Sequence, residues 1–124
     1  MGTDETAEDA ELRESLLRHY LGSADVKIAR IEAALFRLRV AGSEVEQREA
    51  VEHAYTTLHT LAGNAGTYGF PEITARARAL VKALRAETGC TPALLGEFER
   101  FREEVQVAFD AARERLPPEA PSSK

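Results

Sequence analysis

The 124-residue sequence lacks tryptophan and contains a single cysteine, Cys90. One cysteine excludes an internal disulfide and a cysteine-cluster metal site, so the reducing cytoplasm is the expected compartment. Aromatic residues make up only 6% of the chain, and we therefore expect a core built mostly from aliphatic side chains. These absences exclude the small disulfide-stabilised secreted domains and the cysteine-rich zinc domains.

The chain also lacks a block of basic residues and a long apolar run. Its 16 basic and 21 acidic residues give a net charge of −5, which disfavours binding to nucleic acid or to an anionic membrane surface. No apolar run is long enough to cross a bilayer, and the acidic residues 1–9 do not resemble a secretory signal. We expect neither a nucleic-acid partner nor a membrane partner.

The length of the chain accommodates one domain. Residues 1–8 are small, polar and acidic, and we expect a flexible N-terminal tail there. Residues 117–124 contain three of the five prolines, so we expect a disordered C-terminal tail. The folded part is then predicted to span about residues 9–116.

Apolar residues recur at helical spacing through this part, and no stretch alternates like a strand. The pattern predicts a short first helix at about 12–21, then helices at about 24–40, 44–68, 71–84 and 92–116. Ser23 and Thr91 are predicted N-caps, and Ser43 with Glu46 fits a capping box. The sequence therefore predicts an all-α fold, an antiparallel up-down four-helix bundle with the short first helix as a lid across one end.

One segment of the third helix violates the local rules of helix formation. Gly63 and Gly66 both lie within it, although glycine inside a helix costs about 1 kcal/mol relative to alanine. On a helical wheel, His59 falls at the edge of the core stripe, about 100° from the central Leu58. The residues placed to cover His59 are Ala62, Gly63 and Gly66, because helical side chains lean toward the N-terminus. This pattern predicts an exposed imidazole on a flat surface that another protein can approach.

A structural explanation of the same pattern is also open at this point. Small residues at this spacing also let two helices pack closely, and a histidine at a helix edge is most often an ordinary surface residue. Periodicity alone does not decide between these interpretations.

The stretch from His59 to Phe70, HTLAGNAGTYGF, resembles the signature of the histidine-containing phosphotransfer (HPt) domain family. That signature is His-x-Leu-Lys/Ala-Gly followed by small residues and a further glycine, within the second long helix of the bundle. The following Pro-Glu-Ile and the helix up to Leu84 are also similar, and the helix order fits across about residues 9–116. The sequence departs from many members at position 62, where they carry lysine and this chain carries Ala62.

The resemblance implies a role for each residue of the motif. His59 would accept a phosphoryl group on its exposed ring nitrogen, and neutral imidazole is a suitable nucleophile. Gly63 would keep the surface open for a receiver domain, and Thr60, Ala62 and Gly66 would lie in or beside the docking patch.

The resemblance also implies the partners. The chain would be a monomeric phosphocarrier rather than an enzyme, acting with the receiver domain of a response regulator, a hybrid sensor histidine kinase, or both. It would need no cofactor, because the receiver would bring its aspartate pocket and Mg²⁺. Two alternatives remain: a binding module of the same fold that docks a receiver or kinase without phosphotransfer, and a structural bundle that dimerises through its small-residue face.

Other side chains give weaker signals. His53 lies about 120° around the helix from His59, and with His19 elsewhere we expect no metal site. Four cations crowd the fourth helix, and either one of them reaches a phosphoryl group on His59 or they form a solvated basic face; they are Arg76, Arg78, Lys82 and Arg85.

Three further polar or aromatic residues lie within or near the motif. Asn64 is predicted to point away from the core, toward a partner or water. Tyr55 and Tyr68 are predicted to be aromatics of the core or of its edge.

Overall fold

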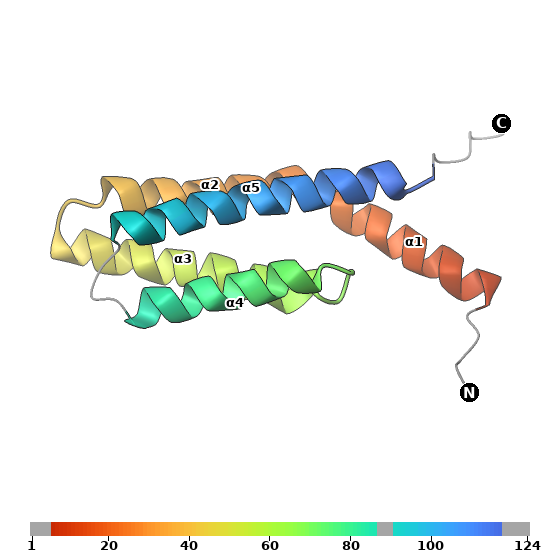
Figure 1. Cartoon of the computed structure of the whole chain (residues 1–124), viewed down its shortest axis with the longest axis horizontal. Coiled ribbons are helices and arrows are strands. Elements are labelled where there is room, and N and C mark those ends of the chain that lie inside the picture. Colours follow the sequence, from red (N-terminus) through yellow and green to blue (C-terminus); the bar gives the residue numbers. More distant parts are fainter. Residues whose placement is uncertain (1–5, 87–90, 118–124) are drawn as a thin grey trace.

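The computed structural model describes residues 6–86 and 91–117, which form five helices and no strand (Figure 1). The all-α prediction is therefore confirmed for this part of the chain. In chain order the helices are α1 (Ala7–Leu21), α2 (Ala24–Val40), α3 (Glu44–Ala65), α4 (Pro71–Ala86) and α5 (Pro92–Arg115).

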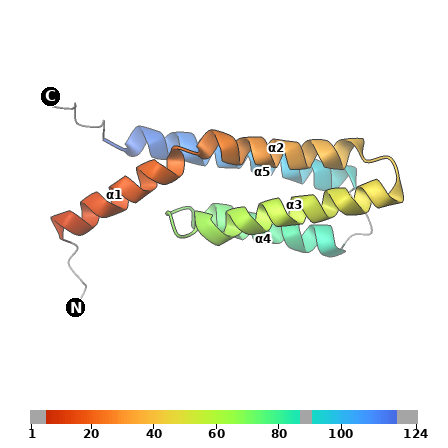
Figure 2. The same ribbon diagram turned by 180° about the vertical axis from the view of Figure 1, so that it is seen from behind.

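Helices α2 to α5 surround a common core. α3 packs against α2 and α4, and α5 packs against the same two helices from the opposite side. Helices α2 to α5 lie side by side along the long axis of the molecule, and α1 projects from one end (Figures 1 and 2). α3 thus has one face in the core and one face open to solvent.

The buried residues are mostly aliphatic, as expected, but aromatic rings are prominent among the largest of them. The largest side chains with almost no exposed surface are Phe98, Phe101 and Phe109 of α5, with Ile31, Leu58 and Val105. Burying a phenylalanine side chain contributes about 1.5–3 kcal/mol. α5 therefore supplies much of the core.

Side-chain caps fix two of the helix starts. The Ser43 hydroxyl accepts a hydrogen bond from the Glu46 amide, and the Glu46 carboxylate accepts from the Ser43 amide, so the predicted capping box is present. The backbone N–H of Gly42, and then that of Ser43, donates to the Glu46 carboxylate and holds the pKa of Glu46 below its usual value. Thr91 caps α5 as predicted. Ser23 is at the N-cap position of α2, but its side chain makes no capping hydrogen bond. Its hydroxyl donates to the Tyr20 carbonyl and accepts from the Lys27 ammonium group.

The third helix ends earlier than predicted. α3 stops at Ala65, whereas the apolar pattern predicted a helix up to Tyr68. The chain turns at Gly69, whose φ of +97° lies in the region that favours glycine, and the Phe70 amide then donates to the Ala65 carbonyl at 2.9 Å. This turn buries Phe70 and starts α4 at Pro71.

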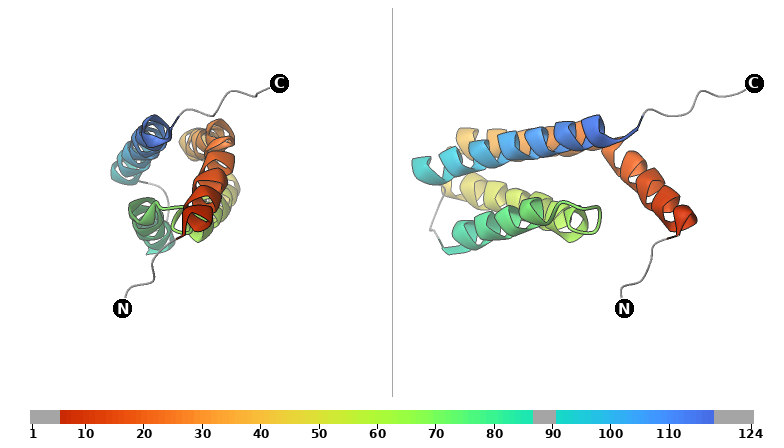
Figure 3. Two further views of the ribbon diagram at one scale, coloured as in Figure 1. Left: turned by 90° about the vertical axis from the view of Figure 1, so that its right-hand side faces the viewer. Right: turned by 45° about the vertical axis from the view of Figure 1, so that its right-hand side comes forward.

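Two predictions about helix α1, its first residue and its position relative to the bundle, were wrong. It begins at Ala7, inside the predicted tail, because the Thr6 hydroxyl accepts a hydrogen bond from the Asp9 amide. It is also not a lid: the helix points away from the end of the bundle (Figure 3). Leu12 and Leu16 are 59% and 46% exposed, and only the last turn enters the core.

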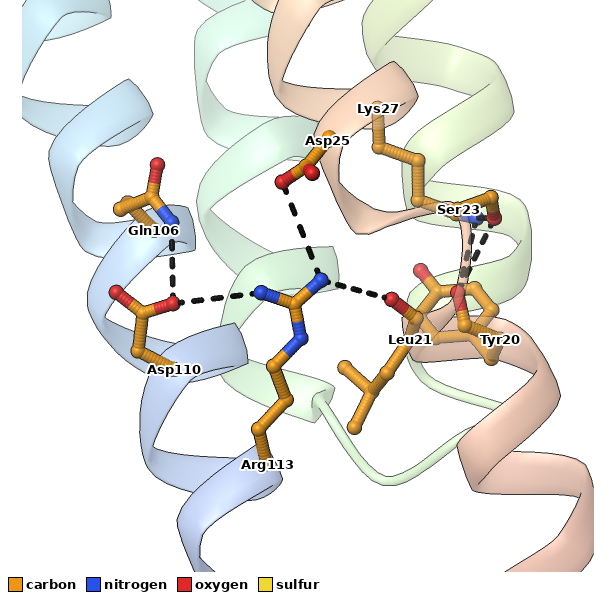
Figure 4. A network of polar contacts seen from close by, with 8 residues as sticks. All are labelled: Tyr20, Leu21, Ser23, Asp25, Lys27, Gln106, Asp110 and Arg113. Carbon is orange, nitrogen blue, oxygen red and sulfur yellow. Dashed lines mark hydrogen bonds and ion pairs between the residues drawn. The ribbon is translucent and has the colours of Figure 1, made fainter.

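A polar network holds the corner between α1 and α2 against α5 (Figure 4). The Arg113 guanidinium donates to the Leu21 carbonyl at 3.1 Å and lies 3.9 Å from Asp25 and 3.8 Å from Asp110. Because the Leu21 carbonyl belongs to the last turn of α1, this bond fixes the point at which α1 leaves the bundle.

Parts of three predicted regions lie outside the described residues. These are residues 1–5 of the N-terminal tail, residues 118–124 of the C-terminal tail, and the part of the loop before α5 that contains Cys90. Among the helices that the structure describes, none is both long and apolar enough to span a membrane.

Candidate functional site

His59 lies on the solvent-facing side of α3. Its neighbours Leu58 and Leu61 are buried in the core, whereas His59 and Thr60 are exposed. This alternation follows from the helical period, which turns residues 59 and 60 away from the core stripe. The predicted exposure of His59 is therefore confirmed.

Of the four residues predicted to surround His59, three are exposed and one is not. Thr60, Gly63 and Gly66 lie on the surface, and together with His59 we refer to them as the His59 surface. The side chain of Ala62 is only 6% exposed. The structure therefore places the Ala62 methyl group in the core beneath this surface, which corrects its predicted place in the docking patch.

The two glycines of the His59 surface have different structural explanations. A Cβ atom on Gly66 would lie 3.1 Å from the Thr74 hydroxyl oxygen, which itself donates to the Ala62 carbonyl at 3.0 Å. Gly66 is therefore explained by the close packing of α4 on α3. A Cβ atom on Gly63 would meet nothing within 4 Å, so the fold does not require glycine there.

An aromatic ring orients the imidazole. The Tyr55 ring, one turn before His59, stacks on the imidazole with 5.7 Å between centroids and an interplanar angle of 11°. The Arg85 guanidinium carbon in turn lies 4.1 Å from the centroid of the Tyr55 ring. Tyr55 is half-buried, which confirms the prediction of a core-edge aromatic, and its ring links α4 to the histidine.

The four cations of α4 have different surroundings. Arg76 faces α5 and donates to Glu104 at 3.0 Å, and Arg85 lies over Tyr55. Arg78 and Lys82 are exposed and have no hydrogen-bond or ion-pair partner among the residues described. Arg78 is one turn after Thr74, which contacts Ala62, so it lies on α4 close to the level of His59.

A comparison with protein-family models settles the family. The model of the Hpt domain matches residues 15–116, which is most of the chain. This chain belongs to the Hpt domain family. No curated protein and no solved structure matches it.

Membership of the family confirms the resemblance seen in the sequence. Hpt domains are the histidine phosphotransfer modules of two-component signalling, where they interact with receiver domains and kinases. In this Hpt domain the match covers α2 to α5 completely and begins within α1, at residue 15.

One polar contact of this Hpt domain was not predicted. The Tyr20 hydroxyl donates to the Asn64 side-chain oxygen at 3.1 Å, so Asn64 is half-buried rather than turned toward a partner. Burial, and to a smaller extent Tyr68, raises the pKa of Tyr20 to about 12. The Tyr68 ring stacks on that of Tyr20 at 4.3 Å, which confirms Tyr68 as a core-edge aromatic.

A groove between α2 and α3 was also missed by sequence reasoning. It has a volume of about 310 Å³ and borders the His59 surface, because Thr60 belongs to both. Its polar lining consists of Lys27, Arg30, Thr56, Thr57, Thr60 and Asn64. Residues from two helices form it, and the sequence gives no signal for their register.

The remaining histidines are separate from the site. The Arg37 guanidinium donates to Nδ1 of His53 at 3.0 Å when that nitrogen is unprotonated, and His19 is exposed on α1. Among the described residues of this Hpt domain, no group of three or more histidine, cysteine, aspartate or glutamate side chains is arranged to hold a metal ion.

Proposed function

We propose that this Hpt domain carries a phosphoryl group on His59 between receiver-domain aspartates, or from a sensor kinase to a response regulator, in a two-component phosphorelay. The observation that carries the proposal is the empty space over Gly63 beside the exposed His59. The glycine costs about 1 kcal/mol of helix propensity, and beside the exposed His59 it leaves the backbone open to a partner.

The chemistry requires little from the carrier. A neutral imidazole nitrogen of His59 attacks the phosphorus of an aspartyl phosphate, the N–P bond forms, and the P–O bond to the aspartate breaks. The aspartate leaves as a carboxylate, and the reverse reaction passes the group onward. In-line phosphoryl transfer depends mainly on positioning and charge neutralisation, so the proposal assigns the aspartate pocket and Mg²⁺ to the receiver. The chain itself acts as a phosphocarrier rather than an enzyme and needs no cofactor.

The side chains around His59 support this role. The Tyr55 ring stacks on one side of the imidazole and limits its orientation. Arg78 of α4, which has no partner among the described residues, lies near the level of His59. The proposal includes the antiparallel up-down arrangement of α2 to α5, with the His59 surface facing outward from a monomeric protein in the cytoplasm.

The test is transfer from phosphorylated receiver domains to the wild-type chain and to a His59→Gln variant. We expect acid-labile, base-stable label on the wild type and none on the variant. Circular dichroism checks that the variant is still folded. Label that persists on His59→Gln would contradict the assignment of His59 as the acceptor.

A docking module without phosphotransfer is the second candidate. The observation that favours it is the buried Ala62, which provides no cation next to His59. A folded wild-type chain that binds a receiver and never becomes labelled would support this candidate. In that case His59→Gln would leave receiver binding unchanged.

A further inference from the structure

The groove between α2 and α3 concentrates positive charge in an acidic protein. The whole chain has a net charge of −5, but the groove is lined by Lys27 and Arg30 and by no carboxylate. Arg30 is exposed and has no hydrogen-bond or ion-pair partner in the part of the chain that the structure describes. Residues 6–86 and 91–117 therefore provide no ion pair that neutralises Arg30 in the groove.

Lys27 has no counterion among the residues that the structure describes. Its ammonium group reaches the Ser23 hydroxyl and the Tyr20 carbonyl, the latter at 3.4 Å, and lies 4.1 Å from the centroid of the Tyr20 ring (Figure 4). All three groups are uncharged. Burial, and to a smaller extent the charge of Arg30 on the same helix, lowers the pKa of Lys27.

The rest of the polar lining is suited to an anion. Thr57 and Thr60 contribute hydroxyl groups, and the Asn64 oxygen is already occupied by Tyr20, which leaves its amide nitrogen as a donor. Cations and neutral donors together favour a carboxylate, because hydrogen bonds to an ionised acceptor are the strong ones. A partner with the opposite charge would also be steered toward this face.

We propose that the groove binds an acidic patch on the receiver domain that docks at His59, so that Lys27 and Arg30 select the partner by charge. Thr60 makes the groove continuous with the His59 surface, so one docked domain covers both. This inference rests on the proposed function, since it takes the receiver as the partner, but it concerns recognition rather than the transfer step.

The experiment compares Arg30→Glu with Arg100→Glu. Both variants reverse the charge of one exposed arginine that has no partner among the described residues, but Arg100 is on α5, which does not pack against α3. Binding of the receiver domains from the source organism is measured by calorimetry at low and high salt, without phosphorylation. Transfer from the same phosphorylated receivers is measured in parallel, and charging by a small phosphodonor such as phosphoramidate reports on His59 alone.

For Arg30→Glu we expect about tenfold weaker receiver binding at low salt, with the difference from wild type shrinking at high salt. Charging by phosphoramidate should be unchanged, and Arg100→Glu should behave like the wild type in every assay. A Lys27→Gln variant tests the second cation, and we expect its loss of binding to have the same salt dependence.

The outcomes separate this inference from the proposed function. Equal receiver binding by wild type, Arg30→Glu and Arg100→Glu would overturn the role of the groove even if His59 is phosphorylated. Weakened binding by Arg30→Glu in a chain that is never labelled would support the groove and contradict phosphotransfer. If no receiver binds the wild-type chain, both proposals fail.

Discussion

The ring of Tyr55 and the imidazole of His59 are stacked nearly parallel, with 5.7 Å between their centroids. They are four residues apart on α3, a spacing that places two side chains on the same helix face. Arg85 lies against the same tyrosine ring, so the orientation of His59 depends on a contact that extends to α4.

We predict that Tyr55→Leu slows phosphoryl transfer to His59 about three- to tenfold, because aromatic pairs contribute about 0.5–1.5 kcal/mol beyond their buried area. The measurement is the single-turnover transfer rate from a phosphorylated receiver. Tyr55→Phe keeps the ring and should transfer like the wild type. Wild-type rates in Tyr55→Leu would mean that the stack does not position the imidazole.

A second prediction concerns Gly63 and uses Gly96 as its control. Both are helical glycines over which a Cβ atom would meet nothing within 4 Å. Gly63→Glu should abolish receiver docking, and Gly96→Glu on α5 should have no effect. Calorimetry measures docking, and size-exclusion chromatography with light scattering reports the oligomeric state. A change of oligomeric state in Gly63→Glu would instead favour the dimerising bundle.

The same glycine gives a prediction about stability. Gly63→Ala should raise the free energy of unfolding by up to about 1 kcal/mol, because alanine has the higher helix propensity and the methyl group meets no neighbour. Urea denaturation measures this change. Gly66→Ala serves as the contrast and should destabilise the protein, because its methyl group would crowd the Thr74 hydroxyl at 3.1 Å. A stabilised Gly66→Ala would contradict the packing explanation of that glycine.

The next prediction concerns Arg78 of α4. Arg78→Gln should slow phosphoryl transfer about tenfold, a loss of about 1.4 kcal/mol of transition-state stabilisation, if its guanidinium neutralises the transferring group. Arg76→Gln is the matched control, because Arg76 is already paired with Glu104 at 3.0 Å and faces α5. Equal transfer rates in the two variants would identify Arg78 as part of a solvated basic face.

The pH dependence of the unfolding free energy should depend on His53. Burial, and then the charge of Arg37, lowers the pKa of His53 in the folded protein, so folding favours the neutral ring. The stabilisation from this shift is complete above the unfolded-state value of about 6.5 and is lost as the pH falls through the lower folded-state pKa. Between pH 7.5 and 5, wild type should therefore lose more unfolding free energy than His53→Gln, as measured by urea denaturation. An equal loss of unfolding free energy in the two proteins over this pH range would contradict the lowered pKa of His53.

Local signals predicted most of the helices and the position of His59. The capping box at Ser43 and the Thr91 cap depend on residues three apart, and the exposure of His59 follows from the helical period alone. The end of α3 was missed because apolar spacing continues past Ala65, while the turn depends on the backbone conformation of Gly69.

The features that the sequence did not reveal are contacts between distant residues. Tyr20 and Asn64 are 44 positions apart, and their hydrogen bond depends on how α1 meets α3. The basic groove likewise requires the register of α2 against α3, which sets Lys27 and Arg30 opposite three threonines. Helical periodicity orients each helix toward the core but does not fix how far one helix slides along another.

The projection of α1 from the bundle determines which part of the protein unfolds locally. Most of its 15 residues are exposed in the part of the chain that the structure describes, and an isolated helix of that length is only marginally stable in water. Amide protons before Arg18 should therefore exchange with solvent long before those of α2 to α5, and the cooperative unfolding unit begins at the last turn of α1. The aromatic contacts of Tyr20 mark that boundary, beyond which α1 unravels and re-forms without disturbing the helix that carries His59.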